Sequence, residues 1–120
     1  MFLQSHQLEK QFLNFQQIKL YVPYNSVIEK VAIENKLEIV YEAFADRNYN
    51  DDLTLVSRVY PYATITDKVK VLEHIKRMVE TSEVKTVQDN KIFIKATTFC
   101  VHGDNKHALD ILMYLNENLE

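Results

Sequence analysis

The 120-residue sequence contains one glycine, Gly103, whereas average usage would give about eight. Glycine adopts positive φ at little cost, so nearly every tight turn of this chain must be built from other residues. The sequence also contains one cysteine, Cys100, which excludes an internal disulfide and a cysteine-rich zinc module. A single thiol suits a reducing compartment.

Long apolar runs and blocks of like charge are absent as well. No window approaches the ~20 apolar residues of a membrane-spanning helix, and residues 1–10 lack the charged and apolar regions of a signal peptide. The net charge of −3 is spread along the chain, without the basic footprint of a nucleic-acid-binding or polybasic membrane-binding protein. We therefore expect no nucleic-acid partner, no membrane partner and a cytoplasmic location.

What is present is the composition of a folded domain. Apolar residues make up 47% of the chain, enough for a core, and no repeat, low-complexity tract or linker divides it. We therefore expect residues 1–120 to form a single domain. Residues 46–65 are polar and show no period, so they are expected to form a long loop, a kind that is usually functional or disordered.

Hydrophobic periodicity elsewhere predicts helices that alternate with strands. The expected helices cover about residues 4–16, a segment from a cap at Asn25 or Ser26 to Lys36, a segment from Thr66 or Asp67 to Thr81, and a last helix capped by Asp104. The expected buried faces are Val27, Ile28, Val31 and Ala32, then Leu72, Ile75 and Val79, then Ala108, Leu109, Leu112 and Leu115. The expected strands are 18–22, 38–45 and 97–101, with a small hairpin of 84–87 and 92–94. This alternation implies an α/β fold with a mainly parallel sheet.

Two segments follow strands of that sheet, where the working groups of parallel α/β proteins lie. In the first, Asp46 has the chemistry of a general base or metal ligand, and Arg47 that of a clamp on an anionic group. The alternative is an Asp46–Arg47 ion pair that only pins its own loop. In the second, His102 can transfer protons, Gly103 can let the backbone approach a ligand, and Asp104 can orient the imidazole or bind substrate.

The second segment also has a purely structural interpretation, with Asp104 as a helix cap and His102 as a satisfied end-of-strand residue. Because both segments leave parallel strands in the same sense, we expect Asp46 and His102 or Asp104 to lie on the same carboxyl-end face of the sheet. His74 and His107 lack a second ligand at helical metal-site spacing and are expected to be solvated. No glycine-rich phosphate loop is present, so no nucleotide site of the P-loop or Rossmann type is expected.

Cys100 lies between two apolar residues of a β-rich run, and it is expected to be a small buried hydrophobe.

Residues 42–58 resemble the pattern E-x-F-A-D-R-x-Y followed by D-G-x-L-V-x-R, and residues 100–104 resemble C-V-H-G-D. Residues 61–67 fall where the same pattern has P-G-A-x-I-x-D. With these blocks in order over about residues 18–118, the sequence resembles the LamB/YcsF family, that of the A subunit of bacterial 5-oxoprolinase.

The resemblance implies a fold and an activity. The fold is α/β, the carboxyl-terminal half of a (β/α) barrel of the glycosidase/deacetylase type. The activity is a hydrolase reaction, the ATP-dependent opening of 5-oxoproline to glutamate, exercised with two partner subunits that supply the ATP dependence. The implied catalytic residues are Asp46, Arg47, His102 and Asp104, and the implied substrate-binding residues are Tyr49, Arg58 and Gly103, with no metal ligand.

The sequence also departs from the family. It lacks the amino-terminal blocks N-C-D-L-G-E, G-A-H-P-G and K-P-H-G-A-L-Y, so we expect a truncated, diverged member that is inactive in isolation. Leu53, Tyr62 and the turn at 22–26 replace family glycines, and Thr97 replaces an aspartate, so the glycine-poor turns must differ or be strained. The alternative to an enzyme subunit is a non-catalytic remnant or interaction module. Either way, we expect association with a separate amino-terminal half or a second copy, covering strand edges and aromatic residues such as Phe12, Phe15 and Tyr21.

Overall fold

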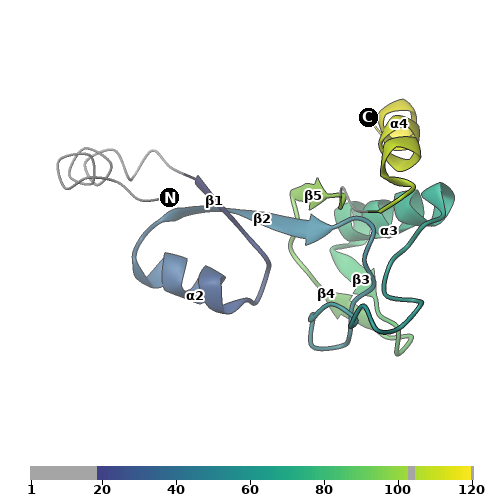
Figure 1. The fold of residues 1–120 in the computed structure, drawn as a ribbon. Coiled ribbons are helices and arrows are strands. Elements are labelled where there is room, and N and C mark those ends of the chain that lie inside the picture. Colours follow the sequence, from purple (N-terminus) through teal and green to yellow (C-terminus); the bar gives the residue numbers. More distant parts are fainter. Residues whose placement is uncertain (1–18, 103–104, 120) are drawn as a thin grey trace, which may run out of the picture.

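The computed structural model describes residues 19–102 and 105–119 of the chain (Figure 1). The elements are β1 (Lys19–Val22), α2 (Val27–Glu34), β2 (Glu38–Phe44), α3 (Lys68–Thr81), β3 (Glu83–Lys85), β4 (Lys91–Phe93), β5 (Thr98–Cys100) and α4 (Ala108–Asn118). Every expected strand is present within a few residues of its predicted position. The expected helix at 4–16 lies outside the described residues.

The sheet is parallel, as the alternation of elements predicts. Its three strands have the order β1-β2-β5, and β3 and β4 form a separate antiparallel hairpin. The first half of β2 pairs with β1, and its second half pairs with β5. β2 therefore joins two parts of the molecule, β1 and α2 on one side and the remaining elements on the other (Figure 1).

Two helices begin where the sequence predicts. The Ser26 side chain accepts a hydrogen bond from the Glu29 N–H at 3.2 Å, and the Asp67 side chain accepts from the Val69 N–H at 2.9 Å. Each cap satisfies a backbone donor that has no partner within its helix. Ser26, rather than Asn25, and Asp67, rather than Thr66, are thus the caps.

The start of α4 differs from the prediction, because its N-cap residue is His107 and not Asp104. The Asn105 side-chain oxygen accepts from the His107 N–H at 3.0 Å, and the Asn105 carbonyl accepts from the Ala108 N–H at 2.9 Å. Asn105 thus accepts from the backbone N–H groups at the start of the helix, which is the task of a capping residue, and the helix begins later than predicted. Asp104 itself lies outside the described residues.

The core lies on both sides of α3. One buried cluster comprises Ala43, Tyr49, Met78, Val84 and Ile94, and the other comprises Ala45, Val71, Ile75, Ile111 and Leu115. The buried face of α3 therefore turns slightly from the predicted one: Ile75 is buried as expected, Leu72 is partly buried and Val79 is 58% exposed. The face turns because β3 and α4 cover α3 from two directions.

The long loop that follows β2 is ordered by its own contacts. Arg47 bridges to Thr64 and Tyr49 to Leu55, in isolated antiparallel pairs. Asp51 ties the loop to the β3–β4 hairpin by accepting from Thr86 Oγ1 and, at 2.8 Å, from Asn90 Nδ2. The loop is thus a fixed part of the fold beside the carboxyl end of β2.

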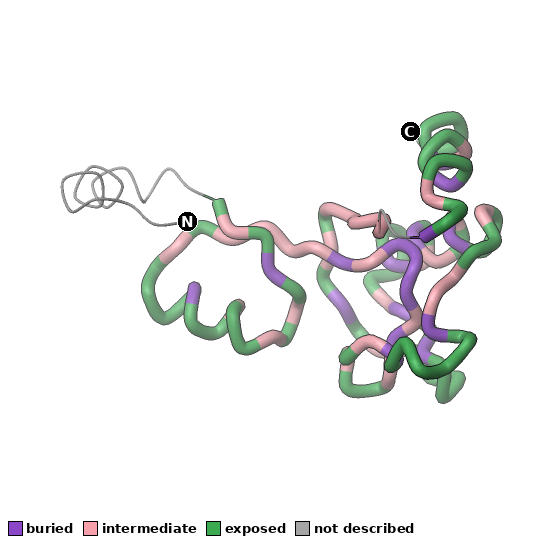
Figure 2. The backbone as a smooth tube through the Cα atoms, in the orientation of Figure 1, coloured by how far each residue is buried: buried purple, intermediate pink, exposed green. Residues whose placement is uncertain are grey.

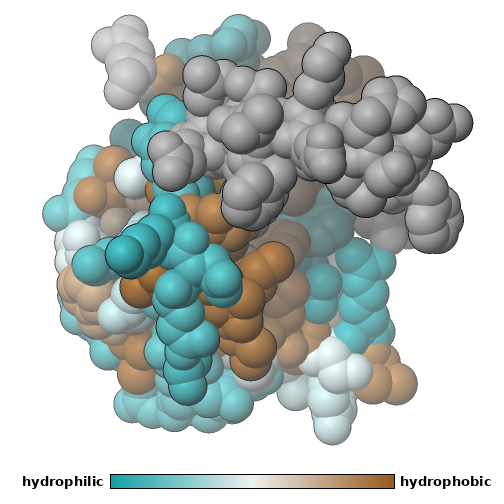
Figure 3. Space-filling view, turned by 90° about the vertical axis from the view of Figure 1, so that its left-hand side faces the viewer, coloured by the Kyte–Doolittle hydropathy of each residue, from teal (hydrophilic) through white to brown (hydrophobic). Residues whose placement is uncertain are grey.

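The predicted buried faces of α2 and α4 are largely exposed. In α2 only Ala32 is buried, while Val27, Ile28 and Val31 are 81%, 52% and 48% exposed. Figure 2 shows α2 as mostly exposed, and Figure 3 shows apolar side chains gathered on the face that α2 and β1 present. β1 and β2 are the elements that pack most extensively on α2, and they cover one side of it.

In α4 the buried residues are Ile111 and Leu115, whereas Leu109 and Leu112 are 72% and 51% exposed. The prediction for Leu109 and Leu112 is therefore wrong, because α4 packs on α3 through one narrow stripe. Tyr21 is 60% exposed, as expected of an aromatic residue on an uncovered edge, while Phe12 and Phe15 lie outside the described residues.

The scarcity of glycine leaves its mark on the turns. Among the described residues, five non-glycine residues have positive φ, and they include Leu53 at 67°, Lys36 at 58° and Asn25 at 63°. Leu53 and Asn25 stand where the family resemblance implies glycine or a glycine-containing turn, so the expected strain is present there. Tyr62 is not among them, and its turn is therefore built differently.

Candidate functional site

The centre of the candidate site is the Asp46 side chain, which is fully buried just beyond the end of β2. Its carboxylate accepts from the His102 backbone N–H at 3.1 Å and from Asn105 Nδ2 at 3.0 Å. The His102 ring Nδ1 lies 3.0 Å from the other carboxylate oxygen. A buried carboxylate is stable only with such partners, and here all of them come from the segment that follows β5.

His102 leaves β5 and presents an imidazole whose side chain is 23% exposed. The ring stacks on Phe44, with centroids 4.9 Å apart and planes 11° from parallel. The Asp46 contact fixes the ring from its Nδ1 side, so Nε2 is the ring nitrogen available to a ligand. The structure thus brings Asp46 and His102 together at the carboxyl ends of β2 and β5, as the shared direction of the two strands predicts.

Arg47 lies beside this pair, but among the described residues it forms no ion pair with Asp46. Its side chain is buried, and it donates from Nη2 to the Val56 carbonyl at 2.7 Å and from Nε to the Ala63 carbonyl at 3.3 Å. These carbonyls belong to the long loop, so Arg47 pins the loop, although through backbone oxygens rather than through Asp46.

These groups surround a cavity of about 210 Å³. The side chains that matter for its chemistry are Asp46, Arg47, Arg58, His102, Asn105 and Lys106. The cavity thus combines one carboxylate and one imidazole with three cationic groups. This composition suits a small ligand that carries negative charge and undergoes proton transfer.

The structure places the predicted substrate-binding residues in different surroundings. Arg58 lines the cavity, whereas Tyr49 is buried in the core, where its hydroxyl oxygen accepts from the Phe44 N–H at 2.9 Å. Burial raises the pKa of Tyr49 to about 12, so this phenol stays neutral. Gly103 lies outside the described residues, as Asp104 does.

Sequence reasoning missed two polar residues of the cavity, Asn105 and Lys106. Asn105 is buried, and its side chain bridges Asp46 to the turn that starts α4. The signal available in the sequence was its place directly after the G-D pair of the second segment. Cys100 is only partly buried, whereas a buried residue was expected, and burial is the main cause that raises the pKa of its thiol.

His74 is not solvated, so that prediction is wrong, whereas His107 is exposed as expected. The His74 ring stacks on Tyr49 at 6.0 Å, and its buried Nε2 has no hydrogen-bond partner. Burial lowers the pKa of His74 from 6.5 to about 4, against smaller opposing effects of the Phe44 and Arg47 backbone and of Asp46. The long loop covers the His74 side chain through Tyr49, and the position of this loop could not be predicted from the sequence.

The described part of the chain contains no group of three or more side chains able to hold a metal ion. Within residues 19–102 and 105–119, none of the helices has the length and hydropathy needed to cross a bilayer.

The fold and site define an α/β protein in which two parallel strands deliver a carboxylate and an imidazole to one polar cavity. The chain belongs to the LamB/YcsF family, whose family model matches residues 5–120. It is 43% identical over 91 residues to the A subunit of 5-oxoprolinase from Thermococcus sibiricus, covering 76% of this chain and 36% of the relative. It is 41% identical over 96 residues to a protein of the same name from Campylobacter jejuni subsp. doylei, covering 80% of this chain and 38% of the relative.

A solved structure shares the fold. The crystal structure of the lactam utilization protein from Thermus thermophilus superposes with a TM-score of 0.75 at 26% identity, over 92% of this chain and 44% of that chain. The chain therefore spans less than half the length of these relatives, 36% and 38% of the two curated ones.

Proposed function

We propose that this chain forms one wall of a site that opens the lactam ring of 5-oxoproline, in an enzyme that resembles the A subunit of 5-oxoprolinase. The observation that carries the proposal is the buried Asp46 carboxylate held against His102 Nδ1 at 3.0 Å beside a polar cavity. The names of the curated relatives and of the solved neighbour support a lactam as the substrate class.

In this proposal His102 transfers the proton, and Asp46 orients the His102 imidazole ring. Opening a lactam requires a base for the attacking oxygen and an acid for the departing nitrogen, and a positioned imidazole serves both steps in turn. Asp46 holds the ring from Nδ1, while Nε2 faces the reacting atoms. Arg58 and Lys106 give the cavity positive charge that attracts the carboxylate of the substrate.

The ATP dependence enters through partner subunits, because the sequence lacks a glycine-rich phosphate loop. The other wall of the site comes from polypeptide that corresponds to the amino-terminal half of the relatives, on this or a separate chain. The exposed apolar faces of α2 and α4 are surfaces on which such a half of the barrel can pack.

The test is 5-oxoproline-dependent ATP hydrolysis by this chain combined with the amino-terminal half and the partner subunits of a relative. We expect His102→Gln to reduce the rate by a factor of about a hundred or more, the usual contribution of a general acid–base group. The matched control is His107→Gln, which changes an exposed histidine of the same segment. Equal rates in the two variants would remove His102 from the mechanism.

A second candidate function is an interaction module without turnover, and the exposed apolar face of α2 favours it. This candidate predicts that the chain binds the amino-terminal half but that the assembled protein neither hydrolyses ATP in response to 5-oxoproline nor binds that ligand. Titration calorimetry with 5-oxoproline on the assembled protein separates the two candidates.

A further inference from the structure

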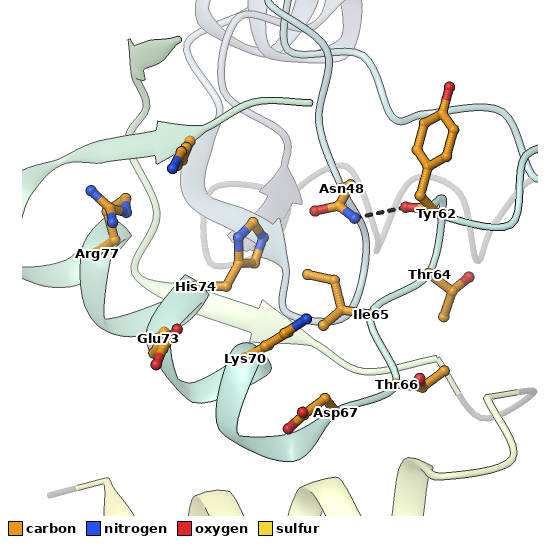
Figure 4. A pocket seen from close by; sticks show the side chains of 11 residues that line it. Asn48, Tyr62, Thr64, Ile65, Thr66, Asp67, Lys70, Glu73, His74 and Arg77 are labelled. Atoms are coloured by element: carbon orange, nitrogen blue, oxygen red, sulfur yellow. Dashed lines mark hydrogen bonds between the residues drawn. The ribbon is translucent and has the colours of Figure 1, made fainter. Parts of the chain in front are cut away.

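A second polar cavity, of about 440 Å³, lies between α3 and the end of the long loop (Figure 4). Lys70, His74 and Arg77 line it from α3, and Lys85 lines it from β3. Thr64 and Thr66 line both this cavity and the one beside Asp46, so the two cavities share a wall. The proposed function uses only the cavity beside Asp46.

The second cavity contains two cations that are not neutralised by neighbouring side chains. Lys85 is held by Asp89 at 3.1 Å, but neither Lys70 nor Arg77 has an ion pair with another residue in the described part of the chain. Glu73 follows Lys70 by three residues and precedes Arg77 by four, spacings at which helical ion pairs form. Neither pair is formed, so both cations remain available to a ligand.

The remaining acid at the cavity is also accounted for. Asp67 accepts the hydrogen bond that caps α3, from the Val69 N–H at 2.9 Å. In Figure 4 it lies at the start of α3, while Lys70, His74 and Arg77 rise from the helix on the side that faces Asn48. α3 therefore contributes two cations, Lys70 and Arg77, and one carboxylate that is unpaired among the described residues, Glu73, to the lining of the cavity.

His74 also lines the cavity from α3. It stands four residues after Lys70 and three before Arg77, on the same face of α3 and in the wall of the cavity. Its Nε2 is a buried polar atom without a hydrogen-bond partner, a condition that native proteins rarely leave uncompensated. Because this atom is buried, the groups of α3 that can reach an anion in the cavity are the two cations that flank His74 in the sequence, Lys70 and Arg77.

We propose that this cavity binds a small oxyanion, a phosphate or carboxylate group, through Lys70 and Arg77. The guanidinium donates two parallel hydrogen bonds to such a group, and the ammonium provides a compact charge on its other side. The shared wall of Thr64 and Thr66 places this anion beside the cavity of Asp46 and His102. A ligand in one cavity can therefore change the affinity of the other cavity for its own ligand.

The test is calorimetric titration of the full 120-residue chain with sodium phosphate and, separately, with sodium acetate, at constant ionic strength set by chloride. We expect saturable binding of at least one of the two anions in excess of chloride. Tighter binding of phosphate assigns the site to phosphoryl groups, and tighter binding of acetate assigns it to carboxylates. No saturable binding of either anion would overturn the proposal.

Lys70→Gln and Arg77→Gln should each weaken binding about tenfold, the effect of losing one charge-assisted contact. The matched control is Lys76→Gln, which removes the same charge from an exposed position of α3 outside the cavity. If Lys76→Gln weakens binding as much, the attraction is general and the site does not exist. Amide NMR spectra of each variant verify folding, and retained phosphate or acetate binding by His102→Gln separates this result from the fate of the proposed function.

Discussion

Asp46 and His102 are 56 residues apart in the sequence, and their side chains meet with Nδ1 3.0 Å from Oδ1. The meeting follows from strand register, because Phe44 of β2 pairs with Cys100 of β5 and each functional residue stands two positions beyond its strand's partner. The Ala45 N–H, donating to the Cys100 carbonyl at 2.9 Å, extends the pairing toward the site. The parallel register thus places both side chains side by side at the carboxyl ends of β2 and β5.

This relationship predicts the effect of Asp46→Asn. The substitution removes the charge that His102 and Asn105 contact, and leaves their donors with a weaker acceptor. We expect the free energy of unfolding to fall by about 3 kcal/mol, the usual cost of breaking a buried pair from one side. Urea denaturation measures it, and Asp110→Asn, at an exposed carboxylate, should stay within about 0.5 kcal/mol of the wild type.

The buried His74 predicts a pH dependence of stability. Its pKa is about 4 in the folded chain, against the ordinary value of 6.5 that applies once the chain unfolds, so the unfolded chain binds the proton more readily. Its stabilising contribution is complete above pH 6.5 and is lost as the pH falls toward 4, by up to about 3 kcal/mol. His74→Phe keeps an aromatic ring against Tyr49, and its stability should change less across this window in denaturant titrations. An equal loss in both proteins would assign the acid sensitivity to other groups.

The end of α2 predicts a stabilising substitution. Lys36 has φ of 58°, and the Leu37 and Lys36 N–H groups donate to the Ala32 and Ile33 carbonyls at 2.9 and 3.0 Å, the pattern that favours glycine at this position. Lys36→Gly should raise the free energy of unfolding by about 1 kcal/mol because the positive φ no longer carries a steric cost.

The control for this substitution is Lys30→Gly, inside α2, where glycine should lower stability by about 1 kcal/mol. Thermal and urea denaturation of the two variants should therefore move in opposite directions. A loss of stability in Lys36→Gly would show that its side chain contributes more than its backbone conformation costs.

The hydrogen bonds between the long loop and the β3–β4 hairpin predict a fourth effect on stability. Asp51→Ala removes the acceptor of Thr86 Oγ1 and Asn90 Nδ2, so we expect a loss of about 1–2 kcal/mol and faster amide hydrogen exchange in residues 50–55. The neighbouring Asp52→Ala is the matched control, because Asp52 accepts hydrogen bonds only from Thr54 among the described residues. If exchange were equally fast in both variants, the hydrogen bonds of Asp51 to Thr86 and Asn90 would not be what orders the loop.

Local signals in the sequence are enough for much of the fold and for part of the site. Ser26 and Asp67 are predictable as caps because their hydrogen bonds are made within three residues, and Asp46 and His102 are expected to meet because parallel strands share a direction. The burial of His74 is not predictable in this way, since its cover comes from Tyr49 in a loop without periodicity. The face of α3 that is buried likewise depends on elements that are distant in the sequence.

The exposed apolar faces predict association. Val27 on α2 and Leu109 on α4 are 81% and 72% exposed, and β1 leaves one edge unpaired among the described strands. Such surfaces are stabilised by covering them, so the isolated chain should self-associate at micromolar concentration, or bind an added amino-terminal half. Sedimentation velocity should show a species larger than the 14.2 kDa monomer, and Val27→Ser with Leu109→Ser should shift it toward the monomer. A sharply melting wild-type monomer that also ignores the amino-terminal half would contradict the prediction, because it would mean that these faces need no partner.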